Sequence, residues 1–249
     1  TLTVAGTLRA GPALAADGRF AVPGLAAAML DRGTASFDRL ALARELEDHG
    51  LELAVRAASA TPTAISFTAQ GLAEEAPRLV ALLAEVLRRP SFPPAELEKL
   101  REQVLGALVQ EREDTHAAAF AALTRALYPE RHPLRRRPVD ERERELRSVT
   151  RDEVAAFHAA AYGPAGMAVA VVGQVEAARA AALLEEAFGG WPPATLEPER
   201  WPETPEPPPA EAIEPSSAVP EPRRSLYERL AELAGERDYE TYWERHFEH

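Results

Sequence analysis

Several kinds of residue and segment are missing from this 249-residue sequence. It has no cysteine, which excludes disulfide bonds and thiolate metal sites. It has no apolar run near the roughly 20 residues that cross a bilayer, so we predict no membrane span. It contains no Gly-rich phosphate loop and no Ser/His nucleophile motif. Acidic residues outnumber basic ones, and the net charge is −12. Because such a surface repels phosphates, we expect no nucleic-acid partner.

The residues that are present describe a globular, helix-rich protein. Hydrophobic residues make up 46% and charged residues 27% of the chain, which is typical of soluble domains. Ala and Leu supply most of the apolar surface, and this favours helices. The first residue is Thr1, so we expect the sequence to be a piece of a longer protein. The compartment stays open between cytoplasm and periplasm, because no targeting segment is visible.

Hydrophobic periodicity predicts an α+β fold. Alternating patterns predict strands at 51–57 and 63–69, which form an antiparallel hairpin. A short, partly alternating segment at 2–9 and a compact apolar run at 166–173 are also predicted as strands. Helical patterns are separated by Pro and Gly and include a capping box formed by Thr150 and Glu153. We expect an antiparallel sheet with helices packed on one face. The expected helices lie at 24–31, 37–50, 73–90, 94–114, 115–128, 151–162 and 176–190, with a polar connection at 128–149.

Finer expectations concern the second of these helices. Ser36 is a suitable N-cap, and Gly50 lies where the helix is expected to end with a residue in the left-handed conformation. Its apolar side is expected to carry Leu40, Leu42, Ala43 and Leu46.

The character of the sequence changes after Trp191. Residues 192–222 hold eleven prolines with interspersed Glu, a composition that cannot bury enough surface to offset its ordering entropy. We predict a folded lobe over 1–191, an extended Pro/Glu-rich linker over 192–222 and a C-terminal helical tail over 223–249.

Six blocks, in order, carry a family resemblance. They are GLAAAMLDRGT (24–34), ALARELEDHGLEL (41–53), LLAEVLRRPSFPPAELEKLREQVLGAL (82–108), LYPERHPLRRRP (127–138), VTRDEVAAFHAAAYGPAGMAVAVVGQV (149–175) and LLEEAFGGW (183–191). With these blocks the chain resembles one lobe of the insulinase/pitrilysin zinc metallopeptidases, the group that includes mitochondrial processing peptidase.

The resemblance implies that the zinc site has been lost. Active members carry His-x-x-Glu-His shortly before a Gly-Thr, with a distant Glu as third ligand. Counted back from Gly33-Thr34, these positions fall on Gly24, Ala27 and Ala28, and the distant ligand falls near Ala107, within a residue. Read without the family, the same stretch is a buried Ala-rich helix. Neither interpretation gives it catalytic or metal-binding chemistry.

The resemblance also implies a role. Family members are built as two halves that close over a peptide, one bearing zinc and one empty. This chain is similar to the first domain of the empty half; nothing after Trp191 resembles the second domain, where the family holds substrate. We expect a non-catalytic lobe without a cofactor of its own. Its partner would be a zinc-bearing half, in the same polypeptide or a separate subunit, and peptide substrate would bind in the assembled chamber. The alternative is a stand-alone scaffold subunit with the peptidase fold.

The histidines are interpreted as structural or surface residues. None has the spacing of a complete metal site, although His246 and His249 stand three apart and a helix could direct both to one ion. That segment is at a chain end and lacks a third ligand. The other four are His49, His116, His132 and His158. The charge runs at 135–137 and 141–147 are expected to form a solvated surface.

Overall fold

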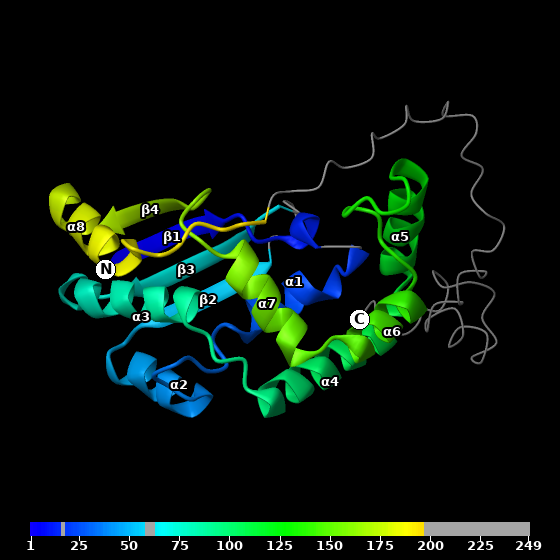
Figure 1. Ribbon diagram of the computed structural model, residues 1–249, viewed down its shortest axis with the longest axis horizontal. Coiled ribbons are helices and arrows are strands. Elements are labelled where there is room, and N and C mark those ends of the chain that lie inside the picture. Colours follow the sequence, from blue (N-terminus) through cyan, green and yellow to red (C-terminus); the bar gives the residue numbers. More distant parts are fainter. Residues whose placement is uncertain (16–17, 58–62, 197–249) are drawn as a thin grey trace, which may run out of the picture. The chain divides into compact units, whose positions relative to one another are not determined.

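The computed structural model describes residues 1–15, 18–57 and 63–196 (Figure 1). These residues fall within one compact unit, Thr1–Pro205. Most of the predicted linker and all of the predicted tail lie outside the described residues. No helix in the described part of the chain has both the length and the apolar character that crossing a membrane requires.

A four-stranded antiparallel sheet forms the base of the fold. Its strands are β1 (Leu2–Leu8), β2 (Glu52–Ala57), β3 (Ile65–Gly71) and β4 (Ala168–Gly173), in the order β2-β3-β1-β4. Val4 of β1 stands opposite Ala69 on one side and Val171 on the other. The predicted hairpin is confirmed as the β2–β3 pair.

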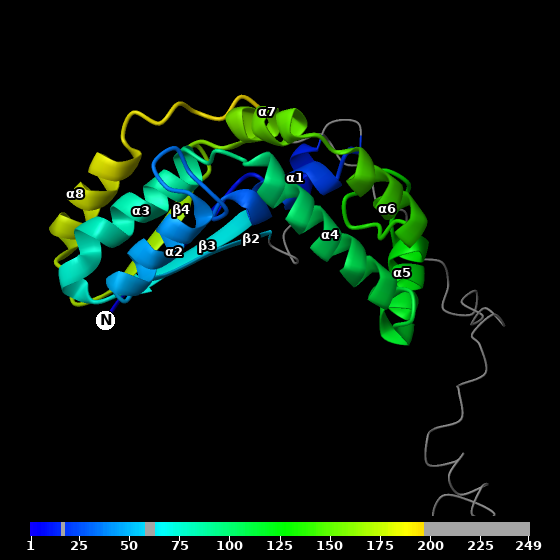
Figure 2. The same ribbon diagram turned by 90° about the horizontal axis from the view of Figure 1, so that it is seen from below.

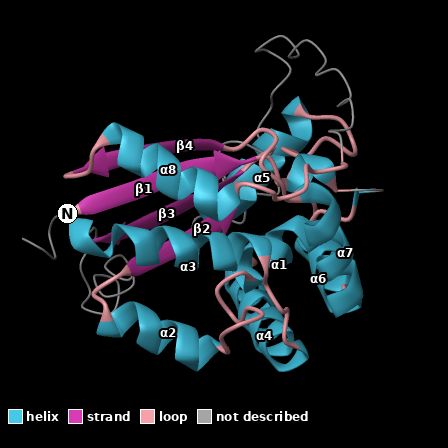
Figure 3. Cartoon of the chain, turned by 60° about the vertical axis from the view of Figure 1, so that its left-hand side comes forward, coloured by secondary structure: helices cyan, strands magenta, loops and turns pink. Residues whose placement is uncertain are grey.

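The two faces of the sheet differ in burial. Leu2, Val4 and Phe67 on the inner face are at most 1% exposed, and the helices pack against this side (Figures 2 and 3). The opposite face is exposed: it carries small residues together with Glu52, Arg56 and Gln70, and Val172 of β4 is 69% exposed. The predicted arrangement, an antiparallel sheet with helices on one face, is therefore confirmed.

Eight α-helices occur in the described residues, together with the short 3₁₀ turns Pro12–Leu14 and Ala73–Glu75. They are α1 (Ala21–Met29), α2 (Arg39–Asp48), α3 (Ala76–Arg88), α4 (Pro94–Glu111), α5 (Thr115–Leu127), α6 (Val139–Ser148), α7 (Arg151–Ala161) and α8 (Ala177–Phe188). Seven of them correspond to predicted helices, although α1 begins three residues before Gly24. The eighth, α6, was not predicted.

Local signals placed some helix ends correctly and others wrongly. The capping box of Thr150 and Glu153 at the start of α7 is present, and Gly50 has φ +60. The N-cap of α2 is Asp38, whose side chain accepts the Ala41 N–H at 2.8 Å, so the prediction of Ser36 was wrong.

The apolar side predicted for α2 was correct only in part. Leu42 is buried and Leu46 is partly buried. Leu40 is 65% exposed and Ala43 is exposed as well. The helix therefore uses a narrower apolar stripe than the sequence pattern indicated.

The helix α6 corrects the prediction of a polar connection over 128–149. Its sequence VDERERELRS is almost entirely charged, so a hydrophobic period is hard to see. Yet Leu146 is only 2% exposed, and ion pairs hold α6 to α4 and to the preceding loop. The charged run at 141–147 is thus a helix that packs with one side, whereas Glu141, Arg144 and Arg147 on its other side are exposed.

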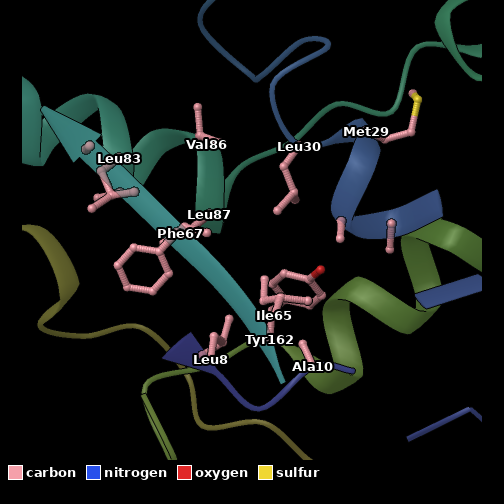
Figure 4. Packing of buried hydrophobic residues seen from close by; sticks show 14 of the residues in the cluster. Leu8, Ala10, Met29, Leu30, Ile65, Phe67, Leu83, Val86, Leu87 and Tyr162 are labelled. Carbon is pink, nitrogen blue, oxygen red and sulfur yellow. The ribbon is translucent and has the colours of Figure 1, made fainter. Parts of the chain in front are cut away.

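The hydrophobic core lies between α3 and the sheet. In Figure 4, Leu83 and Leu87 of α3 lie beside Phe67 of β3, in one cluster with Val86. Gly6 of the neighbouring β1 lies directly against the Phe67 ring, and a Cβ at this position would overlap it. The fold therefore needs a glycine in β1 to accommodate an aromatic ring in β3.

Candidate functional site

The positions that the resemblance assigns to the zinc motif, Gly24, Ala27 and Ala28, lie on two sides of α1. Gly24 and Ala28, one turn apart, are half-buried and line a cleft. Ala27 is 2% exposed and belongs to the hydrophobic core. A Cβ added to Gly24 would meet no atom within 4 Å. Gly24 and Ala28, where the resemblance implies zinc ligands, therefore face the cleft. Ala27, where it implies the general base, faces the core.

The fourth position, Ala107 on α4, is exposed and does not line this cleft. Its neighbour Leu108 does, with Val104 one turn before it. Leu108 is within the one-residue range of the sequence prediction. The structure thus brings the start of α1 together with Leu108, and it does not bring Ala107 to Gly24.

The cleft itself has a volume of about 590 Å³. Its walls are α1, the second half of α4, the inner side of α5, part of α6 and the loop around residues 133–137. Apolar side chains dominate the α5 wall, where Phe120 and Leu123 are 50% and 49% exposed. Its size lies within the range of pockets that bury a small ligand, roughly 300–1,000 Å³.

The start of α1 is held in place by α6. Phe20 occupies the N-cap position and offers no capping side chain. Instead, Glu145 of α6 accepts a hydrogen bond from the Ala21 N–H at 2.8 Å. Glu145 also pairs with Arg137, and the Arg137 guanidinium lies 4.9 Å from the centre of the Phe20 ring. A carboxylate at a helix N-terminus is favoured by the helix dipole.

A second carboxylate, Glu111 at the end of α4, binds two arginines. Arg136 lies 2.7 Å and Arg142 2.6 Å from its two oxygens. Burial raises the pKa of Glu111, but the hydrogen bonds from these two guanidinium groups outweigh it and hold the pKa below its ordinary value. Sequence reasoning missed this cluster; the only available signal was the Arg135–Arg137 run.

The Gly33-Thr34 pair that closes the motif has a structural role. Gly33 has φ +146, and a Cβ there would lie 2.9 Å from Pro93 and 3.0 Å from Ser91. Thr34 is buried, and its hydroxyl accepts the N–H groups of Ser36 and Phe37. The pair therefore fixes the turn between α1 and α2, independently of any metal.

The residues at the motif positions do not fit zinc. Gly24, Ala27 and Ala28 carry no side-chain donor atom, and Leu108 offers none from α4. Zinc sites in proteins use Cys, His, Asp or Glu ligands. Across the described ranges, no group of three such side chains is close enough to hold a metal ion.

The described histidines lie at separate places. His49 is beside Glu45 and Glu75, and His116 is exposed at the start of α5. His132 is buried and His158 is buried against α3. His246 and His249 lie outside the described residues, so their pairing is still a prediction.

The two buried histidines are held in packing environments. The His132 ring stacks on Tyr128 at 4.5 Å between ring centres, and burial lowers its pKa. His158 donates from Nε2 to the Leu87 carbonyl at 2.9 Å. Burial lowers the His158 pKa more than this hydrogen bond raises it. Both rings are therefore suited to a neutral, structural role.

In this α+β architecture a helix of small residues lies beside an open cleft, and Gly24, Ala27 and Ala28 offer no side-chain donor atom to a metal ion. Two family models match the chain. The model described as insulinase (peptidase family M16) matches residues 25–136, and the one described as peptidase M16 inactive domain matches residues 148–239. Together they span most of the sequence. The chain belongs to the insulinase family of peptidases, M16.

Solved structures share the fold. The peptidase M16 inactive domain from Pseudomonas fluorescens has a TM-score of 0.71 at 23% identity, over 82% of this chain and 49% of that one. A protease from Helicobacter pylori has a TM-score of 0.67 at 14% identity, over 82% and 48%. The periplasmic protease PqqL from Escherichia coli has a TM-score of 0.70 at 18% identity, over 82% and 23%.

The matched structures are longer than this chain. The chain spans about half the length of the first two structures and less of the third. No curated protein matches the chain. The M16 inactive-domain match continues past Trp191 to residue 239, and the boundaries at 191 and 222 stay predictions.

Proposed function

We propose that this chain is a non-catalytic lobe of an insulinase-like zinc peptidase. In this role it pairs with a zinc-bearing half and completes the chamber in which peptides are cleaved. One observation carries the proposal: in a chain of the M16 family, the cleft-facing positions of α1 are Gly24 and Ala28, which supply no ligand. Zinc-dependent hydrolysis at this cleft then requires groups from beyond the described residues, since Leu108 on the facing helix offers none either.

The architecture supports the same role. The chain spans about half the length of the M16 inactive-domain structure it resembles, so further chain of the same family is expected to complete the assembly. The open face of the sheet, where Val172 is exposed, leaves a broad surface without covering helices in the described part of the chain. A lobe of this kind restricts which polypeptides enter and leaves bond cleavage to its partner.

The proposal is tested in two steps. First, the purified chain is melted with and without one equivalent of zinc and incubated with a mixture of unstructured peptides. We expect neither a change in melting temperature nor any cleavage product. Stoichiometric zinc binding together with hydrolysis by this chain alone would overturn the proposal.

Second, the tagged chain is isolated from its own cells, and the complex is assayed for zinc and for peptide hydrolysis. We expect a His-x-x-Glu-His half, in the same polypeptide or as an equimolar subunit, and hydrolysis that stops when the Glu of that motif is changed to Gln. Recovery of stable structural partners with neither zinc nor hydrolysis would favour the scaffold alternative.

A further inference from the structure

The cleft beside α1 combines an apolar wall with a basic rim. Phe120 and Leu123 on α5 line it and are about half exposed, and Leu127 continues this wall. Exposed apolar residues are common singly, but a contiguous group that lines a concavity indicates a binding surface. On the opposite wall α1 contributes the small residues Gly24 and Ala28 together with the buried Leu25, and the space between the two walls stays open.

The rim is unusual for a protein of net charge −12. Four arginines line the cleft, against a single lining carboxylate, Glu145. Arg136 and Arg142 share one carboxylate, that of Glu111. Arg137 pairs with Glu145. The local excess is therefore of positive charge, whereas the surface as a whole is acidic.

Arg135 differs from the other three arginines. Its guanidinium donates to two backbone carbonyls, those of Arg125 and Tyr128. Within the described residues it makes no ion pair with a carboxylate. These two bonds fix the position of the group and leave its charge without an acidic partner there. A preorganised guanidinium loses less side-chain entropy when it binds a carboxylate.

We propose that this cleft binds an acidic peptide segment that also carries a bulky apolar side chain. The apolar side chain would contact Phe120 and Leu123, and flanking carboxylates would pair with Arg135 and Arg136. A small inorganic anion makes no use of the apolar wall, and a purely apolar ligand makes no use of the guanidinium groups. The inference rests on the proposed function, in which this lobe lines a peptide chamber, and it names the substrates that the lobe would favour.

The test uses the full chain and three labelled peptides in a fluorescence anisotropy titration. The first is acetyl-Glu-Glu-Phe-Leu-Glu-amide, the second has Lys in place of every Glu, and the third has Ala in place of Phe and Leu. We expect saturable binding of the first peptide, no binding of the second and at least about tenfold weaker binding of the third. Binding of the first peptide should also weaken as salt is raised, because salt screens exposed ion pairs.

Two pairs of variants locate the site. Arg135→Gln should weaken the acidic peptide at least about tenfold, as expected for a charged anchor, whereas the exposed Arg179→Gln on α8 should not. Phe120→Glu puts a carboxylate in the cleft and should abolish binding. Its control is Leu72→Ala, which removes another exposed apolar side chain at a distant position and should have no effect. Phe120 is half-exposed, so Phe120→Glu is expected to fold even if Arg135→Gln does not.

Three results would overturn the proposal. They are binding of the Lys peptide as tight as that of the acidic one, binding unchanged in Phe120→Glu, and no binding of the acidic peptide. A concentration-dependent dimer that Phe120→Glu dissociates, without peptide binding, would assign the cleft to a second copy instead. None of these results affects pairing with a zinc-bearing half, so failure here is distinguishable from failure of the proposed function.

Discussion

The contact between Glu145 and the start of α1 gives the sharpest stability prediction. The Glu145 side chain is 8% exposed, accepts the Ala21 N–H at 2.8 Å and pairs with Arg137. A hydrogen bond to a charged group contributes about 1.5–3 kcal/mol, and an N-cap typically contributes about 1 kcal/mol. These two energies describe overlapping interactions and are not added. In the variant, Arg137 keeps its contact with Phe20. We therefore expect Glu145→Ala to lower the free energy of unfolding by about 2–3 kcal/mol.

The measurement is urea unfolding followed by circular dichroism. Glu145→Gln keeps an oxygen acceptor and loses the charge, so it should cost about half as much as Glu145→Ala. Glu141→Gln on the exposed side of α6 is the matched control and should stay within about 0.5 kcal/mol of the wild type. Hydrogen exchange should show faster exchange at the first amides of α1 in Glu145→Ala. If Glu145→Ala is as stable as the control, the proposed cap does not hold α1.

Three further predictions concern other sites. The free energy of unfolding should fall as pH drops through about 6.5, because the unfolded chain takes up protons that the buried His132 and His158, with their lowered pKa values, do not; His158→Gln should reduce this slope between pH 7.5 and 5.5, and an unchanged slope would contradict the assignment of His158. Gly33→Ala should cost about 1–3 kcal/mol, since φ +146 is strained for any residue with a Cβ; a Gly50→Ala variant, with open space around its Cβ, should cost less. Thr150→Ala should cost about 1 kcal/mol by removing the capping box of α7, measured by thermal melting against Thr195→Ala.

The fold could be predicted largely because its signals are local. Alternation identified β2 and β3, short apolar runs identified β1 and β4, and the capping box of Thr150 located the start of α7 to the residue. The N-cap of α2 was misplaced because Ser36 and Asp38 are both good caps, and only the backbone geometry after Thr34 selects Asp38. That geometry depends on a β-bridge to Pro90, far along the chain.

The helix α6 shows why part of the candidate site was missed. Its charged residues were assigned to solvent, because a local pattern reports hydrophobic period and not the partner of a charge. The partners lie far away in sequence: Arg142 binds Glu111, 31 residues earlier, and Glu145 binds the Ala21 N–H, 124 residues earlier. The helix α5 was likewise predicted, but the sequence pattern does not show which of its sides stays exposed, because that depends on the elements that pack against it.

These long-range contacts also change how the small residues Gly24 and Ala28 of α1 are interpreted. The motif positions alone predict a loss, since the resemblance implies that Gly24 and Ala28 stand where active members of the family have metal ligands. In the fold, these small residues leave an open floor under a wall of Phe120 and Leu123 and a rim that includes Arg135. A helix that had lost its ligands without any other use would be expected to close its cleft with larger apolar side chains, because burying them stabilises the fold. The cleft has stayed open and has a positive rim, and selection of acidic peptides is a use that accounts for both features.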